Sequence, residues 1–350
     1  MLFSPPPPAA PAVYQQRLDE LVATGVPGAV LLVRDGRHVF RLAAGTSDLS
    51  TGEPMRVDDR FRIASLTKTF AATVVMQLVD EGRLSLDDTV ERWLPGTVPN
   101  GASITIRQLL GHQSGVFDFQ NDPRVLAPYL AGELDHYWSP LALLGVATSH
   151  APDFAPGQGV AYSATGYVAL GLIVEAATGH SMSREMRTRL FRPLGLRSTT
   201  YPDSALIRTR HAHGYLNVPG QPLQDVTGIS PSYYWTTGNI VSTTTDVARF
   251  YDALFAGRLV SPARLAEMET TRPDARGVQW GLGLYHGRLS CGDYWGHDGA
   301  APGYLSVAFE SPDGRRAVVA LINAMTFEET AGDATSQAAW RALVDDAFCR

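Results

Sequence analysis

Lysine is nearly absent from this sequence. Of its 29 basic residues only one, Lys68, is a lysine, and the other 28 are arginines. Arginine stays protonated in proteins, whereas a buried lysine can lose its proton. A general bias toward arginine explains most of the 28, but it does not explain why one lysine remains. A site that needs an amine able to become neutral would explain it.

Long apolar runs and an excess of positive charge are also missing. No run approaches about 18 apolar residues, so the sequence predicts no transmembrane helix. The net charge is −6 and is spread along the chain, which argues against nucleic acids and anionic membranes as partners. With 350 residues, 45% of them hydrophobic, the chain can bury a core in one large domain or two interleaved ones.

Cysteine occurs only twice, as Cys291 and Cys349, 58 positions apart. Two cysteines alone cannot build a zinc site, and this spacing is not that of a CxxC redox motif. Two alternatives stay open at this point: unrelated buried thiols, or a disulfide that ties a C-terminal helix to a strand. A disulfide would imply an oxidising compartment, so we expect a secreted or extracytoplasmic protein if the bridge forms and a cytoplasmic one if it does not.

The N-terminal segment, residues 1–11, is rich in proline. As written it has neither the basic segment nor the apolar core of a signal peptide, and secretion would therefore require a leader that this chain lacks. We interpret residues 1–11 as a stiff, extended leader.

Hydrophobic periodicity predicts strands at both ends of the sequence and helices in the middle. An Asp35-Gly36 turn joins two strands into a hairpin, and Gly82 ends a helix that begins at Ser65. The predicted helices cover 13–24, 65–81, 104–110, 165–178 and 329–348, and the predicted strands cover 29–33, 38–43, 280–285, 294–297, 304–310 and 317–323.

The economical arrangement of these elements is an α/β plus all-α fold. An antiparallel sheet is flanked by the N- and C-terminal helices, and a large helical insertion interrupts it. We expect residues 12–62 and 235–350 to form the sheet domain and residues 63–234 to form the helical domain.

Ser65 and Lys68 lie three residues apart where the predicted helix begins. This spacing puts both side chains on the same helix face. A serine there can attack a carbonyl group while its own N–H helps to hold the oxyanion, and a neutral lysine beside it can take the hydroxyl proton. The alternative is that Ser65 only caps the helix.

Two further segments carry a family resemblance. They are Tyr162-Ser163-Ala164 and Gly296-His297-Asp298-Gly299-Ala300, and LLGHQSGVFDF at 109–119, STTTD at 242–246 and the final Ala347-Phe348-Cys349 add to the likeness. The chain resembles the serine penicillin-recognising hydrolases, which include the class C β-lactamases and the D-alanyl-D-alanine carboxypeptidases. The likeness covers nearly the whole chain and is nearest to the secreted Streptomyces-type carboxypeptidases. It implies a β-lactamase/transpeptidase-like fold.

The resemblance also implies a role for each matching residue. Ser65 would be the acylated nucleophile, Lys68 the amine that accepts its proton and Tyr162 the phenol that passes the proton to the leaving group. His297 and Gly299 match the family's His/Lys-x-Gly strand. The backbone N–H groups of Ser65 and Ala300 would form the oxyanion hole, Phe119 and Trp235 would line the substrate site, and Cys291 and Cys349 match a disulfide of the subgroup.

Three departures from the family pattern point to a different substrate. Ala164 stands where the family has the Asn of Tyr-x-Asn, and Asp298 and Ala300 stand where the carboxypeptidases usually carry hydroxyls. Tyr285 falls at the place of the arginine that captures a terminal carboxylate. A site that loses this arginine and gains Asp298 repels a carboxylate. We expect a substrate without a free carboxylate at the scissile end, unless Arg288 reaches into the site and restores the anchor.

The sequence therefore predicts a serine hydrolase or acyltransferase that works through an acyl-enzyme on an amide or ester. The alternatives are a D-alanyl-D-alanine carboxypeptidase proper, a transacylase of specialised metabolism and, outside catalysis, a penicillin-binding sensor. We expect a small-molecule or peptide acyl substrate, no cofactor, no metal, no nucleic-acid or membrane partner, and a monomer.

Overall fold

The computed structural model of the protein describes residues 10–218, 221–326 and 331–350. Its centre is a nine-stranded sheet in the order β3-β2-β1-β13-β12-β11-β10-β9-β8, in which neighbouring strands run antiparallel. The strands are β1 (Gly28–Asp35), β2 (His38–Asp48), β3 (Glu53–Pro54), β4 (Phe61–Arg62), β5 (Tyr215–Asn217), β6 (Gln224–Asp225), β7 (Val241–Ser242), β8 (Arg272–Pro273), β9 (Gln279–Trp280), β10 (Tyr285–Leu289), β11 (Gly292–Ala301), β12 (Tyr304–Glu310), β13 (Arg316–Ile322) and β14 (Ala324–Thr326).

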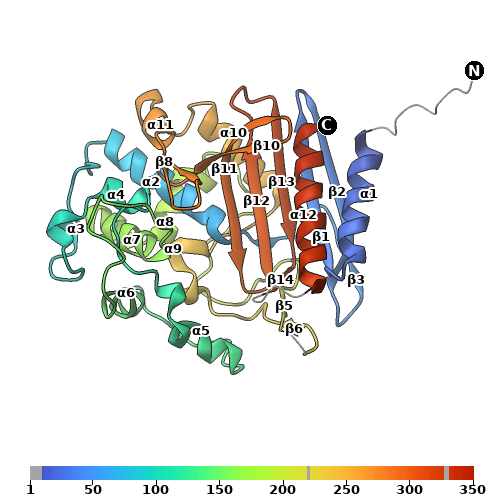
Figure 1. The fold of residues 1–350 in the computed structure, drawn as a ribbon, viewed down its shortest axis with the longest axis horizontal. Helices are drawn as coiled ribbons and strands as arrows, with labels where there is room; N and C mark the ends of the chain where they lie inside the picture. Colours follow the sequence, from blue (N-terminus) through green and yellow to red (C-terminus); the bar gives the residue numbers. More distant parts are fainter. Residues whose placement is uncertain (1–9, 219–220, 327–330) are drawn as a thin grey trace, which may run out of the picture.

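Helices lie on both faces of this sheet (Figure 1). The α-helices are α1 (Ala10–Ala23), α2 (Thr67–Asp80), α3 (Val90–Trp93), α4 (Ile106–Leu110), α5 (Pro123–Leu130), α6 (Pro140–Thr148), α7 (Ala164–Thr178), α8 (Met182–Met186), α9 (Trp235–Gly238), α10 (Thr244–Phe255), α11 (Pro262–Met268) and α12 (Ala331–Cys349). Two further turns matter below: a 3-10 turn, η1 (Ala64–Leu66), and a π-helical turn, η4 (Arg187–Phe191).

The two ends of the chain meet in the middle of the sheet, where β1 pairs with β13. Alternate side chains of β1 point to opposite faces. Leu31 and Val33 join the core beneath α1 and α12, where Leu18 is fully buried, whereas Val30 and Leu32 join the core on the helical side. Burying one such side chain stabilises the fold by about 2 kcal/mol. The expected antiparallel sheet, with terminal helices on one face and a helical region on the other, is confirmed.

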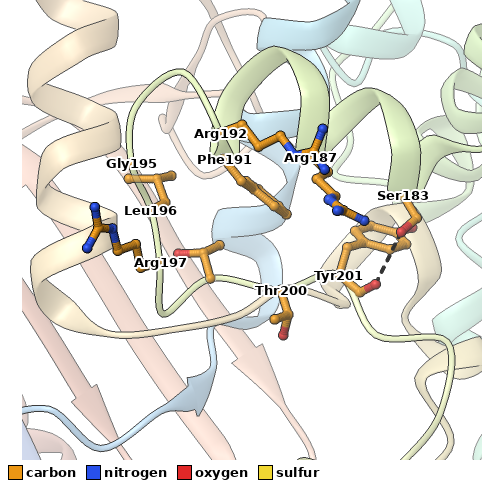
Figure 2. Close-up of a pocket in the computed structure, with 10 residues that line it drawn as sticks. Ser183, Arg187, Phe191, Arg192, Gly195, Leu196, Arg197, Thr200 and Tyr201 are labelled. Atoms are coloured by element: carbon orange, nitrogen blue, oxygen red, sulfur yellow. Dashed lines mark hydrogen bonds between the residues drawn. The ribbon is translucent and has the colours of Figure 1, made fainter.

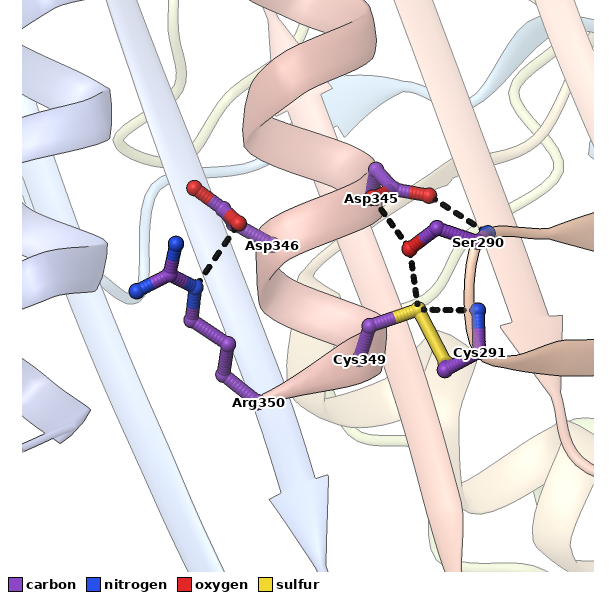
Figure 3. The surroundings of a disulfide bond; sticks show 6 residues. All are labelled: Ser290, Cys291, Asp345, Asp346, Cys349 and Arg350. Carbon is purple, nitrogen blue, oxygen red and sulfur yellow. Dashed lines mark hydrogen bonds and ion pairs between the residues drawn. A yellow bond between two sulfur atoms is a disulfide. The ribbon is translucent and has the colours of Figure 1, made fainter.

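A disulfide between Cys291 and Cys349 fixes the end of α12 to the turn between β10 and β11 (Figure 3). Ser290, next to it, donates hydrogen bonds from its N–H (2.8 Å) and its hydroxyl (2.6 Å) to the carboxylate of Asp345 on α12. The bridge and these polar contacts hold the C-terminal helix on the sheet. The sequence left the pairing open until the resemblance favoured it, and the disulfide is confirmed.

The predicted strand over 280–285 is wrong in its middle. β9 ends at Trp280 and β10 begins at Tyr285, because the intervening turn needs Gly283 at a φ of 84°. A Cβ on Gly283 would lie 2.2 Å from the Cβ of Ala72 on α2, so this turn packs directly on the helix that follows Ser65.

Other element boundaries differ by a few residues. β1 extends beyond the predicted strand 29–33 at both of its ends, and β2 continues beyond residue 43 to Asp48. α4 begins at Ile106, after a capping box formed by Thr105 and Gln108. Most of the expected leader lies outside the described residues, and Ala10 and Pro11 already belong to α1.

The division of the chain into domains stays a prediction. α10, which we assigned to the sheet domain, does lie against β1 and β13, while α9 contacts α2 and α7 of the helical segment. Within residues 10–218, 221–326 and 331–350, no helix is both long and apolar enough to cross a membrane.

Candidate active site

Ser65 lies in η1, the turn that leads into α2, so the α-helix begins two residues later than predicted. β4 fixes this turn by pairing with β7. Ala64 has a φ of 49°, in the left-handed region that residues other than glycine seldom adopt. Within residues 61–76 every residue except Ser65 is buried. The fold thus presents one hydroxyl group from an otherwise buried segment.

Two polar side chains contact the hydroxyl of Ser65. Nζ of Lys68 lies 3.0 Å from Oγ of Ser65, and the hydroxyl of Tyr162 donates to the same oxygen at 2.8 Å. Lys68 also donates to the backbone carbonyl of Thr237, at 2.8 Å. The structure therefore brings together the three residues that the sequence singled out from positions up to 97 residues apart.

Burial decides the charge states of these groups. Lys68 is fully buried, and burial lowers its pKa to about 7, although the carboxylates of Asp118 and Asp298 act in the opposite direction. Burial raises the pKa of Tyr162 well above its ordinary value. Near neutral pH the phenol therefore keeps its proton, while the amine is poised between its charged and neutral forms. A neutral amine at this distance can accept the proton of Ser65.

Asp118 is a site residue that the sequence analysis did not single out. Its carboxyl group is buried, which raises its pKa, while the N–H groups of Gln120 and Ala164 and the charge of Lys68 act to lower it. It lies near the start of α7, close to where the family carries the Asn that Ala164 replaces. In this chain the carbonyl of Thr237 is a second acceptor for Lys68. Asp118 does fall within the family-like segment 109–119, which was the available signal.

Two aromatic rings pack against Tyr162. The ring of His112 lies 4.6 Å from the Tyr162 ring, and the ring of Trp280 lies 5.3 Å from it. The N–H of Ser163 donates to Nδ1 of His112 at 3.2 Å, and burial keeps the pKa of His112 well below its ordinary value. His112 is thus an uncharged packing partner of the phenol. The sequence analysis named neither His112 nor Trp280 as site residues.

β11 passes directly beside the nucleophile. A Cβ added to Gly299 would lie 2.9 Å from the backbone N of Ser65 and 2.8 Å from the carbonyl oxygen of Ile63. Only glycine allows this approach. The next residue, Ala300, is solvent-exposed and pairs with Leu305 on β12. The backbone of this strand is therefore close enough to Ser65 for an oxyanion to be shared between the two segments.

The side chains before Gly299 on β11 differ sharply in exposure. His297 is buried, and burial lowers its pKa to about 4, so its imidazole is neutral. Nδ1 of His297 interacts with the backbone carbonyl of Asp298, and the ring lies 5.6 Å from that of Tyr285. The side chain of Asp298 is 60% exposed. The site therefore has one carboxylate that faces solvent, and its charge acts on both Lys68 and His297.

Arg288 does not provide a cation here. Its guanidinium is 74% exposed and lies 3.1 Å from the carboxylate of Asp293, across the β10–β11 hairpin. Asp293 pairs with Arg288 in the strand register, and Gly296 pairs with Tyr285, so Arg288 points from the end of the hairpin that is farther from Gly299. The alternative in which Arg288 restores a carboxylate anchor has no support in this geometry.

The two aromatic residues expected to line the site have different positions. Phe119 has 0% exposure, and its backbone N–H already donates a hydrogen bond to Oγ1 of Thr165 at 2.9 Å. Its position is that of a core residue, which departs from the expectation. Trp235 is partly exposed and starts α9, two residues before Thr237, so it stays a candidate wall residue. Among the described residues no group of three metal-ligating side chains is found.

These features decide the family. Residues 14–340 match the family model described as beta-lactamase. The chain belongs to the beta-lactamase family. It is a serine hydrolase, as are its relatives, and the mixed fold is shared with solved structures of the family.

Several relatives match nearly end to end. The chain is similar to a D-stereospecific amidohydrolase from Streptomyces sp., with 38% identity, a TM-score of 0.86 and coverage of 97% of this chain and 98% of that one. It is also similar to the D-amino acid amidase from Ochrobactrum anthropi SV3, with 30% identity, a TM-score of 0.86 and coverage of 96% and 97%. Penicillin-binding protein 4 of Amycolatopsis lactamdurans is 35% identical, over 84% of this chain and 80% of that protein.

Proposed function

We propose that this beta-lactamase family member hydrolyses amides of small substrates that carry a free amino group and no carboxylate at the scissile end. The observation that carries this proposal is the position of Asp298. Its carboxylate is 60% exposed on the strand that passes beside Ser65. An ammonium group on the substrate is attracted by the negative charge of Asp298, which favours binding, whereas a carboxylate on the substrate is repelled by it.

The relatives support the amine-bearing substrate class. The solved structures described above are titled as a D-stereospecific amidohydrolase and a D-amino acid amidase, and a D-aminopeptidase from Brucella anthropi is 28% identical over 88% of this chain. We therefore assign the preferred substrate to the amides of D-amino acids.

In acylation, Oγ of Ser65 forms a bond to the amide carbon. Neutral Lys68 takes the hydroxyl proton, and the oxyanion is held by the backbone N–H groups of Ser65 and Ala300. The C–N bond then breaks, and Tyr162 passes a proton to the departing amine while Lys68 restores the proton of the phenol. The high pKa of Tyr162 suits this role, because the phenol stays protonated between transfers.

In deacylation, a water molecule attacks the ester of Ser65. Its oxygen forms the new bond to the acyl carbon, and the bond from that carbon to Oγ breaks. Lys68 takes a proton from the water and returns one to Oγ, so the enzyme regains its starting state and the acid product leaves.

The test compares four substrates: D-phenylalanine amide, its N-acetyl derivative, L-phenylalanine amide and N-acetyl-D-alanyl-D-alanine. We expect kcat/KM to be highest for D-phenylalanine amide. Removing the ammonium charge by acetylation should lower kcat/KM about fivefold, since an exposed charge pair is worth about 1 kcal/mol. The variant Asp298→Asn should remove this difference when both amides are compared well above the pKa of Lys68, where the loss of the Asp298 charge no longer changes the fraction of neutral amine.

Arg288→Gln is the matched control, because Arg288 pairs with Asp293 at the far end of the hairpin. It should leave all four rates unchanged. Faster release of D-alanine from N-acetyl-D-alanyl-D-alanine than of ammonia from D-phenylalanine amide would overturn the proposed function in favour of a carboxypeptidase.

A further inference from the structure

A cavity of about 590 Å³ lies beside η4 and the loop that runs on to Tyr201 (Figure 2). Its lining includes Arg187, Arg192 and Arg197, and none of the groups that contact Oγ of Ser65 belongs to it. We propose that this cavity binds a small soluble anion that carries two or more phosphoryl groups. The proposal does not depend on the function assigned to the Ser65 site.

The guanidinium groups of the three lining arginines form no ion pairs within the described part of the chain, although the lining residue Thr199 donates to the buried carboxylate of Asp246. Arg189, in the same π-turn, differs from these three arginines because its guanidinium forms ion pairs with both Glu81 and Glu185. In a protein with a net charge of −6, three guanidinium groups around one cavity form a local anion-attracting field.

The backbone of η4 is what places two of these arginines together. The N–H of Arg192 donates to the carbonyl of Arg187 at 3.0 Å. This hydrogen bond joins residues five positions apart, whereas the hydrogen bonds of an α-helix join residues four apart. In a regular α-helix, residues five apart differ by about 140° around the axis and face different ways. The π-turn stacks them one above the other, and both line the same cavity. Such turns are rare and occur often at functional sites.

A second hollow of about 470 Å³ shares Arg187 and Arg192 with the first and adds Arg184. The Arg187–Arg192 pair thus stands between two adjoining hollows. A ligand with one phosphoryl group would use one hollow, whereas a ligand with two or three would fill both. Guanidinium groups bind phosphoryl groups and carboxylates alike through paired hydrogen bonds, and a polyphosphate fits better than a single carboxylate because it can place negative charge in both hollows.

The back of the cavity is formed by buried side chains, among them Phe191 and Thr199. The ring of Phe191, which lines it, packs edge-on against Phe70 of α2 at 6.3 Å. Thr199 beneath it is buried and donates to the carboxylate of Asp246 at 2.9 Å. The arginines therefore extend from a packed part of the fold. We expect binding to require little additional ordering of the backbone, and so little loss of backbone entropy.

The test is isothermal titration calorimetry of the whole protein, which measures the affinity and stoichiometry of tripolyphosphate, orthophosphate and citrate at low and high salt. We expect tripolyphosphate to bind one site per chain, at least about tenfold more tightly than orthophosphate or citrate, and to weaken as salt is raised. Arg187→Gln and Arg192→Gln should each weaken binding by about tenfold or more, because each removes charge-assisted hydrogen bonds.

Arg41→Gln on β2 is the control for general charge and should leave the affinity unchanged. A melting temperature equal to that of the wild type in all three variants would show that they are folded. The proposal is overturned if tripolyphosphate gives no saturable binding, if Arg187→Gln and Arg192→Gln both bind it as tightly as the wild type, or if citrate binds equally well.

Discussion

Nζ of Lys68 lies 3.0 Å from Oγ of Ser65 and donates a hydrogen bond to the backbone carbonyl of Thr237 at 2.8 Å. The amine therefore has one fixed acceptor and one partner that can exchange a proton with it. This geometry, together with full burial, lets a residue that is normally charged act as a base near neutral pH.

The pH profile of the reaction should report Lys68. Burial lowers the pKa of Lys68 to about 7, and only the neutral amine can accept a proton. We therefore expect kcat/KM to rise with pH, tenfold per unit below about pH 7, and to level off above it. The measurement uses p-nitrophenyl acetate, whose own charge does not change in this range. Lys68→Arg should lose nearly all activity, because arginine does not deprotonate, and a near-normal rate in this variant would refute the assignment.

Tyr162→Phe should remove the proton donor without disturbing the fold. The ring keeps its contacts with His112 and Trp280, and only the hydrogen bond to Ser65 is lost. We expect kcat for an amide to fall about 100-fold or more, with little change in KM, since proton transfer to the leaving group contributes at least this much. An unchanged melting temperature serves as the structural control. A kcat within twofold of the wild type would exclude Tyr162 from the proton path.

Gly299→Ala should separate β11 from the nucleophile. The added Cβ would lie 2.9 Å from the backbone N of Ser65 and 2.4 Å from Oγ of Ser306, so the strand must move. A displacement of about 1 Å can cost about 100-fold in rate, and we expect a loss of that size in kcat/KM. Gly145→Ala on α6 is the matched control, because its Cβ would meet nothing within 4 Å. Equal effects of the two substitutions would contradict the close approach.

The Cys291–Cys349 disulfide should contribute measurably to stability. It spans 58 positions, and in the chain-entropy model a loop of that length contributes about 4 kcal/mol to the free energy of unfolding. We expect urea unfolding of the double variant Cys291→Ala/Cys349→Ala to give a lower free energy by about that amount. Wild-type protein in reductant should behave like the variant. Equal midpoints for the oxidised wild type and the variant would show that the bridge does not stabilise the fold.

The sequence predicted the parts of the site that local spacing determines. Ser65 and Lys68 lie on one face because they are three residues apart, and Gly299 was recognised from its strand motif. The packing of His112 and Trp280 around Tyr162 was not predicted, because these residues lie 50 and 118 positions from Tyr162 in the sequence. The role of the Thr237 carbonyl was equally hidden, since every residue has a carbonyl and no side chain marks that one.

The same distinction explains the errors in the fold. The hairpin at Asp35-Gly36 and the helix end at Gly82 follow from local backbone preferences, and both were found. The break in the strand over 280–285 depends on Ala72, which is more than 200 positions away and blocks any side chain at Gly283. Phe119 was expected near the substrate because it lies in a family-like segment, but its ring is fully buried and packs edge-on against Tyr233, more than 100 positions away.

The most direct test of the central claim is to locate the acyl group in acid-quenched enzyme. Wild-type protein and the variants Ser65→Ala and Lys68→Arg are mixed with p-nitrophenyl acetate, quenched during turnover and weighed intact, and the modified peptide is sequenced by mass spectrometry. The account predicts one acetyl group on Ser65 in the wild type and none in Ser65→Ala. Turnover that persists in Ser65→Ala, or an acetyl group on a different residue during turnover, would contradict it.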